Sequence, residues 1–174
     1  MVLLTYTCVS CVLLLMAYED LRYRSVHKLL FALSALCLSA LALMSNLGAL
    51  VLLKYFVINC LICLALFAVL KLHFSIKEGK RSKVIDRLLG LGDVLMILTF
   101  GLVFHPVNFI YFLFGSFLLT LVVHSLYVLF KSNSSRFIPL IFYMNLAFVS
   151  LLIYDSTGEG FSMFKLNGLT FFVQ

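Results

Sequence analysis

A stretch without any Asp, Glu, Lys or Arg runs from Val94 to Phe130, and it constrains the fold more than any other feature. One membrane helix needs only about 20 apolar residues, and Pro106 interrupts the helical hydrogen-bond ladder within this stretch. The whole chain is 64% hydrophobic and only 11% charged, whereas a soluble domain has about a quarter charged residues. Too little polar surface would remain to cover a soluble globule. The sequence therefore predicts a polytopic membrane protein.

Apolar runs bounded by charged or turn-forming residues predict an all-α membrane protein, a bundle of six transmembrane helices within residues 1–154. Residues 155–174 are expected to form an external C-terminal tail. The fourth span is unusual, because the 13 residues from Asp93 to His105 give only about 20 Å of helix. We therefore expect this helix to begin near Leu88, which would place Asp93 inside the membrane boundary. The six predicted spans cover about residues 2–18, 29–44, 50–70, 88–105, 109–130 and 139–154.

The basic residues predict the orientation of these spans. The loops at 19–28, 71–87 and 131–138 lie on one side of a six-span protein and hold 11 of the 13 Lys and Arg residues. The positive-inside rule makes that side cytoplasmic and both termini external, as in a multi-pass protein of the inner membrane. The net charge of +6 thus reflects topology and contact with the lipid bilayer rather than binding of nucleic acid.

The longest cytoplasmic loop has two predicted features. Apolar and charged residues alternate at helical spacing over 84–89, which indicates a short interfacial helix before the fourth span. Because residues 71–90 are rich in charge and include two glycines, we expect this loop to be a mobile gate for substrate. Contact with anionic lipid is an equal alternative for this basic loop.

Two of the seven acidic residues, Asp20 and Asp93, are predicted at the cytoplasmic ends of spans one and four. An ionisable residue at membrane depth is costly and is a candidate functional residue. Asp93 follows Gly90 and Gly92, and two interpretations of these glycines stay open. They could let another backbone approach closely, or they could form a loop-to-helix junction that Asp93 caps.

Two neighbouring carboxyl groups can hydrolyse a peptide bond without a metal or a cofactor. Since two close Asp side chains do not both ionise readily, they share a proton. One then acts as base toward water while the other protonates the substrate. The sequence contains no zinc-protease motif, phosphate-binding loop or nucleophile elbow. We expect the cysteines to be packing residues, and Asn59 and Asn145 to form hydrogen bonds between helices.

Two short motifs resemble the type IV prepilin peptidases. Glu19–Val26, with Asp20, is similar to the first Asp motif of that family, and Gly90–Val94, with Asp93, is similar to its GxGD motif. Ile138–Leu140 is similar to the proline-containing start of the family's last span. The resemblance implies an aspartyl endopeptidase that removes the basic leader from prepilin or pseudopilin substrates at the cytoplasmic face. In that case Asp20 and Asp93 form the catalytic pair. The residues that support the motifs are Gly90, Gly92, Arg22 and Arg24.

The sequence also departs from the family pattern. The family usually has Ile-Pro-Asn where Val26-His27-Lys28 stands here, and Lys where Leu95 stands. The loop at 19–28 is too short for the Cys-rich domain of larger members, so we expect a short form without methyl transfer. The resemblance implies no cofactor and no metal, and the sequence leaves the oligomeric state unknown.

Two other functions are compatible with six spans in so short a chain. One is a small-molecule-binding subunit of a membrane transporter, in which Asp20 and Asp93 contact the ligand or a partner. The other is a non-catalytic assembly subunit of a membrane complex, in which both acids are structural. A transporter pocket should open outward, and few polar residues lie within the spans on that side.

Overall fold

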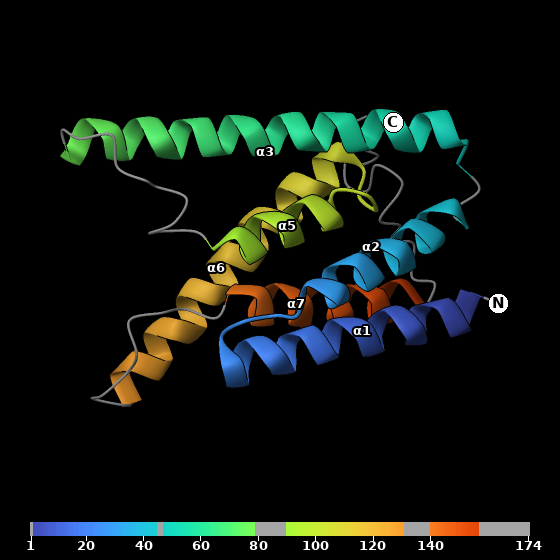
Figure 1. Cartoon of the computed structure of the whole chain (residues 1–174), viewed down its shortest axis with the longest axis horizontal. Helices are drawn as coiled ribbons and strands as arrows, with labels where there is room; N and C mark the ends of the chain where they lie inside the picture. The colour runs from blue at the N-terminus through green and yellow to red at the C-terminus, as the bar shows by residue number, and fades with distance from the viewer. Residues whose placement is uncertain (1, 45–46, 79–89, 131–139, 157–174) are drawn as a thin grey trace, which may run out of the picture.

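The computed structural model describes residues 2–44, 47–78, 90–130 and 140–156, and these form six α-helices without any strand. The prediction of an all-α protein is confirmed for these residues. Figure 1 shows the helices: α1 (Val2–Tyr23), α2 (Lys28–Leu43), α3 (Ala49–Glu78), α5 (Leu91–Phe100), α6 (Pro106–Phe130) and α7 (Leu140–Ser156).

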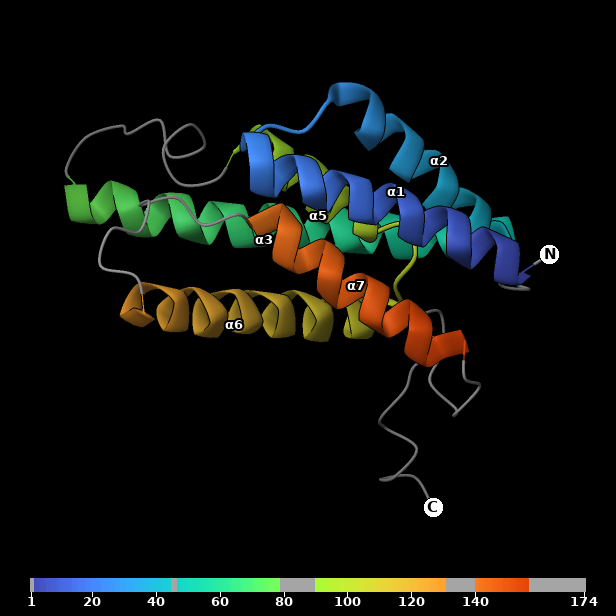
Figure 2. The same cartoon turned by 90° about the horizontal axis from the view of Figure 1, so that it is seen from below.

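The first and last helices form the closest pair in the bundle. α1 packs along α7 and also against α2, while α5 contacts α2, α3 and α7 (Figures 1 and 2). α6 packs against α7 and α3. The short helix α5 therefore lies in the middle of the bundle, between the α1–α2–α7 group and α3.

An aromatic cluster fills the space between α5, α6 and α7. The rings of Phe100 and Phe148 stack with their centroids 4.6 Å apart, and those of Phe104 and Phe112 stack at 4.8 Å. All four side chains are buried. Aromatic pairs of this kind stabilise a fold by about 0.5–1.5 kcal/mol beyond the burial of apolar area. The cluster holds the far end of α5 in place.

Three of the helices are long and apolar enough to cross a membrane. They contain the segments Leu4–Tyr23, Ala49–His73 and Pro106–Tyr127. The other three, α2, α5 and α7, have 16, 10 and 17 residues. Ten residues of helix rise only about 15 Å, half of a bilayer core of about 30 Å. The structure therefore supports a membrane protein with three long apolar helices, and the count of six spans stays a prediction.

The expected fourth span differs most from the structure. α5 begins at Leu91 and ends at Phe100, so the prediction of a helix up to His105 was wrong. The buried side chain of Asn59 on α3 explains this end, because its Nδ2 donates to the carbonyls of Gly101 and Phe104, both at 2.9 Å. These bonds satisfy carbonyl groups that a continuing helix would have used. Pro106 then opens α6, a position where its missing N–H is not needed.

The long charged loop predicted at residues 71–87 also begins later than expected. α3 continues to Glu78, so residues 71–78 are helical rather than part of a loop. The expected interfacial helix at 84–89 and most of the expected gate lie outside the described residues. The same holds for Pro139 and for the tail from residue 157.

Polar contacts tie α1 to α7 at three levels, at every seventh residue of α1. Tyr6 donates its hydroxyl proton to Asp155, and the Leu13 carbonyl accepts a hydrogen bond of 3.0 Å from Asn145 Nδ2. At the third level Asp20 Oδ2 accepts the backbone N–H of Phe142 at 3.0 Å. The predicted bond between helices is thus confirmed for Asn145, whereas Asn59 on α3 bonds to the cap of α5 and to the connection that follows it. The α1–α7 pair is thus fixed along its whole length, and Asp20 lies at one end of it.

Candidate functional site

Asp20 lies in the last turn of α1, and its side chain is 9% exposed. Its Oδ2 accepts the N–H of Phe142, which belongs to the first turn of α7. The first N–H groups of a helix have no partner inside the helix, and the helix dipole favours a negative charge there. The start of α7 therefore holds the Asp20 carboxylate and offsets part of the cost of its burial.

Asp93 lies in the first turn of α5. Its Oδ2 accepts the N–H of Gly90, the residue that caps this helix, at 3.1 Å. The interpretation as a loop-to-helix junction is therefore confirmed for Gly90, which is itself the cap, with Asp93 bonding back to it from the third helical position, while Gly92 already lies inside the helix. α5 begins at Leu91, after the extended backbone of Gly90 with φ −64° and ψ 148°, and the expected start near Leu88 lies outside the described residues.

Gly92 also fits the other interpretation, that of a close approach. A Cβ atom at this position would lie 3.3 Å from Ile141 Cδ1 on α7 and 3.3 Å from Phe31 Cζ on α2. Such distances are tighter than ordinary van der Waals contact. Since Gly92 has no side chain, α2 and α7 can both pack closely against the turn that carries Asp93.

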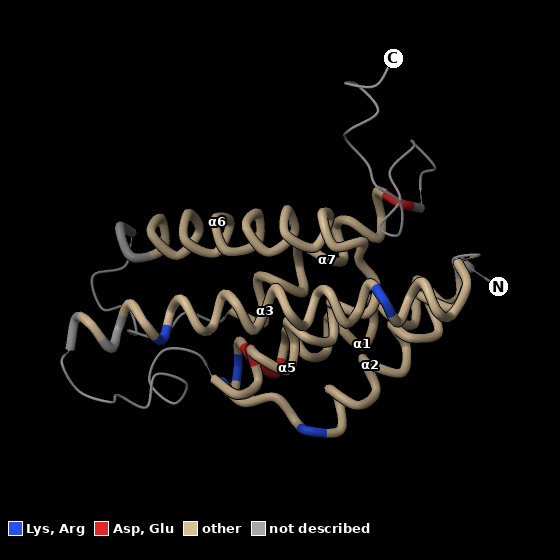
Figure 3. The backbone as a smooth tube through the Cα atoms, turned by 90° about the horizontal axis from the view of Figure 1, so that it is seen from above, with Lys and Arg blue, Asp and Glu red and all other residues tan. Residues whose placement is uncertain are grey.

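The structure brings Asp20 and Asp93 to the same end of the bundle. The two side chains are near enough for the charge of Asp20 to act on Asp93. Figure 3 shows acidic positions of α1 and α5 gathered there, whereas the acidic position at the end of α7 is remote. α2 and α7 each contact both α1 and α5, so they set the spacing of the two Asp residues.

The two motif arginines, Arg22 and Arg24, are exposed and form no ion pair with either Asp within the described ranges. The Arg22 guanidinium lies 5.7 Å from the centre of the Tyr18 ring and 5.3 Å from that of Tyr23, and Arg22 also donates to the Tyr18 hydroxyl. Arg24 follows α1 with a φ of 54°, and its N–H donates to the Asp20 carbonyl at 3.0 Å. Arg24 therefore ends α1 in the left-handed conformation, at a position that glycine usually occupies.

Arg24→Gly is expected to stabilise the fold, because a non-glycine residue in the left-handed region costs about 1–2 kcal/mol. Glycine loses more freedom on folding, so the net gain should be below about 1 kcal/mol. Thermal unfolding of the two proteins in the same detergent measures the difference. Arg22→Gly, inside the helix, is the control and should destabilise; a lower midpoint for Arg24→Gly than for the parent would contradict the strain argument.

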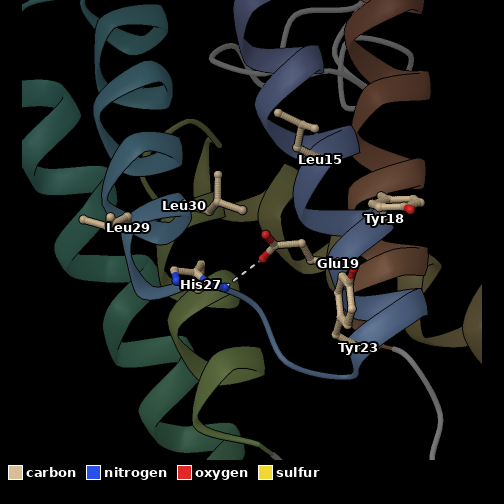
Figure 4. Close-up of a pocket in the computed structure, with 7 residues that line it drawn as sticks. All are labelled: Leu15, Tyr18, Glu19, Tyr23, His27, Leu29 and Leu30. Carbon is tan, nitrogen blue, oxygen red and sulfur yellow. Dashed lines mark hydrogen bonds between the residues drawn. The ribbon is translucent and has the colours of Figure 1, made fainter.

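Sequence reasoning missed the roles of Glu19 and His27. Glu19 Oε2 accepts the backbone N–H of His27 at 2.9 Å, across eight residues of chain. Figure 4 shows both residues in a recess between α1 and α2. The only sequence signal for this bond was that His27 stands where the family pattern has proline, because proline has no N–H to donate. The recess is lined by Leu15, Tyr18, Glu19, Tyr23, His27, Leu29 and Leu30.

The part of the chain that the structure describes contains no group of three or more His, Cys, Asp or Glu side chains that could hold a metal ion. The five cysteines are free thiols, of which Cys63 alone is buried. The candidate site thus rests on two carboxyl groups, two helix N-termini and the turn after α1.

Comparison with known protein families identifies the chain. The model of the Type IV leader peptidase family matches residues 7–125. The chain belongs to this family. The match includes both Asp20 and Asp93 and stops before α7, so the Phe142 amide that binds Asp20 comes from outside the matched segment. Neither the curated proteins nor the solved structures include a match. Membership in the family indicates a peptidase, and together with the apolar helices it indicates a membrane protein.

Proposed function

We propose that this leader peptidase is an aspartyl endopeptidase that removes the basic leader from prepilin or pseudopilin-like substrates, with Asp20 and Asp93 as the catalytic pair. The observation that carries the proposal is that Asp20 in the last turn of α1 and Asp93 in the first turn of α5, 73 positions apart in sequence, lie at one end of the bundle, near enough for a charge on one to act on the other. Both belong to the segment that the leader peptidase family matches.

The hydrogen bonds among the described residues leave one oxygen of each carboxyl group for chemistry. Asp20 and Asp93 each use Oδ2 for a backbone N–H, and no described residue bonds to either Oδ1. A water between the two Oδ1 atoms could lose a proton to the ionised carboxylate while its oxygen attacks the peptide carbonyl carbon. The protonated partner would give its proton to the carbonyl oxygen. Collapse of the tetrahedral intermediate then breaks the C–N bond, and the leaving nitrogen takes up the proton that the base gained from water.

The two backbone N–H groups have a second role in this mechanism. They hold the carboxyl groups in fixed orientations, so little order has to be gained when substrate binds. They also come from helix N-termini, which favour the ionised base. The mechanism therefore needs only the described side chains and water.

We further propose that the site faces the cytoplasm and that both termini are external. Three exposed basic residues lie in or beside the turn between α1 and α2, namely Arg22, Arg24 and Lys28, which favours the cytoplasmic side. In a cysteine-free variant, Ser25→Cys should react with an impermeant maleimide only after the cells are permeabilised. The matched control is Leu50→Cys at the start of α3, which should react in intact cells. Labelling of position 25 from outside would overturn the topology.

Co-expression with candidate prepilins tests the function itself. Loss of the leader should appear as a mobility shift on an immunoblot, and only when an active peptidase is present. A wild-type chain that leaves several prepilin-like proteins unprocessed would instead favour the transporter-subunit or assembly-subunit alternatives.

A further inference from the structure

Glu19 connects the end of α1 to the start of α2. Its carboxylate accepts the backbone N–H of His27, the residue that caps α2, and no side chain caps this helix in addition. Figure 4 shows the bond closing the turn between the two helices. Glu19 forms no ion pair within the described part of the chain, so the bond to the turn is the interaction that the structure gives it. This turn begins at Arg24, one helical turn after Asp20.

The backbone of His27 adopts a conformation that suits proline. Its φ is −63° and its ψ is 132°, and a proline ring fixes φ near −65°. A proline at this cap position costs the helix no internal hydrogen bond, because the first N–H groups have no partner inside the helix. His27 stands where the family pattern has proline. A histidine at this position has no ring to hold φ, but it has the N–H that Glu19 binds.

The start of α2 in turn reaches the second carboxylate. Phe31, one turn into α2, lies against Gly92, next to Asp93. A short path of contacts therefore runs from Asp20 through Glu19 and the cap of α2 to the turn that carries Asp93. A shift of the α2 start would change the spacing of the two Asp residues.

We infer that Glu19 is a positioning residue: its hydrogen bond to His27 holds the start of α2 in the conformation that a proline would impose, and so sets the spacing of Asp20 and Asp93. Only the activity test of this inference rests on the proposed function. Glu19 contributes an acceptor oxygen in this role, and its charge is not required.

The activity test follows from that distinction. Glu19→Ala should lower kcat for leader cleavage by about 10- to 100-fold, because displacements of about 1 Å cost this much, with little change in KM. Glu19→Gln should retain activity, since its amide oxygen accepts the same N–H. Ser25→Ala, in the same turn, is the control and should match the parent. If Glu19→Gln is as inactive as Glu19→Ala, Glu19 acts through its charge and the inference is wrong.

A second substitution provides a rescue. His27→Pro removes the N–H and fixes φ at the value already present, so it should restore most of the activity that Glu19→Ala loses. A role of Glu19 that is independent of the turn predicts no rescue. Equal losses in Glu19→Ala and in Glu19→Ala/His27→Pro would therefore overturn the inference.

Cross-linking measures the spacing without any need for catalysis. In a chain without its native cysteines, Asp20→Cys and Asp93→Cys are joined with a short bifunctional maleimide. Adding Glu19→Ala should slow the cross-link at least threefold, and adding His27→Pro should restore its rate. An unchanged rate with Glu19→Ala, or no cross-link in the parent pair, would contradict the positioning role. If the wild type cleaves no leader but the rate still depends on Glu19, the proposed function fails and the positioning role stands.

Discussion

Replacement of Asp20 or Asp93 by Asn is expected to lower leader cleavage by a factor of about 10² to 10⁴, the usual contribution of proton transfer by a positioned side chain. Because the two carboxyl groups act as a unit, the double variant should be hardly less active than either single variant. Cleavage is measured with purified proteins in detergent and a fluorescent leader peptide.

The choice of Asn separates chemistry from folding. Its side-chain oxygen can still accept the N–H of Phe142 or of Gly90, so both helix starts keep their caps. With either Asn variant the site holds at most one ionised carboxylate, as the proton-sharing Asp pair does, so the unfolding temperature should stay near that of the parent. Asp20→Ala, which loses the acceptor, should be both inactive and less stable.

Asp155→Asn is the matched control for these variants. Asp155 also lies near a helix end and accepts a hydrogen bond, but from Tyr6 and at the far end of the α1–α7 pair. It should keep full activity. Asp86→Asn, at a position outside the described residues, should also remain active. A variant of Asp93 with full activity would exclude the proposed mechanism.

Gly92→Val is expected to abolish most activity by a different route. The added atoms would meet Phe31 and Ile141, because even a Cβ lies only 3.3 Å from each. Overpacking of this kind costs about 1–3 kcal/mol of stability. It would also move the first turn of α5 away from α2 and α7, and a misplacement of about 1 Å at Asp93 would cost about 100-fold in rate.

Gly115→Val is the control for this steric argument. Gly115 also lies in an apolar helix, but a Cβ there has no atom within 4 Å. This variant should unfold near the parent temperature and keep its activity. Equal effects of valine at both positions would show that loss of glycine, rather than crowding beside Asp93, is responsible.

The all-α fold was predictable from the apolar runs, but the helix ends depend on tertiary contacts. Pro106 predicted the break between α5 and α6, whereas the early end of α5 results from Asn59, more than 40 residues away in sequence. Similarly, the charged residues after Leu70 suggested a loop, yet α3 continues through them to Glu78. Hydropathy marks apolar segments and does not report where the helical hydrogen bonds stop.

The two candidate catalytic residues were predictable from the sequence, but the groups that hold them in place were not. Composition singled out Asp20 and Asp93, because acids near the membrane are rare in this chain. Their partners are backbone N–H groups of Phe142 and Gly90, which carry no sequence signal of their own. The bond between Glu19 and His27 was equally hidden, because a sequence does not reveal which N–H groups find a side-chain acceptor.

Mass spectrometry of a prepilin-like substrate incubated with the purified peptidase tests the central claim most directly. The wild type should release one intact leader and one mature protein. Their two masses should add up to the mass of the substrate plus one water. Asp20→Asn and Asp93→Asn, folded and present at the same concentration, should leave the substrate uncut over the same time. Release of the same leader at the wild-type rate by either Asn variant would contradict the assignment of the catalytic pair.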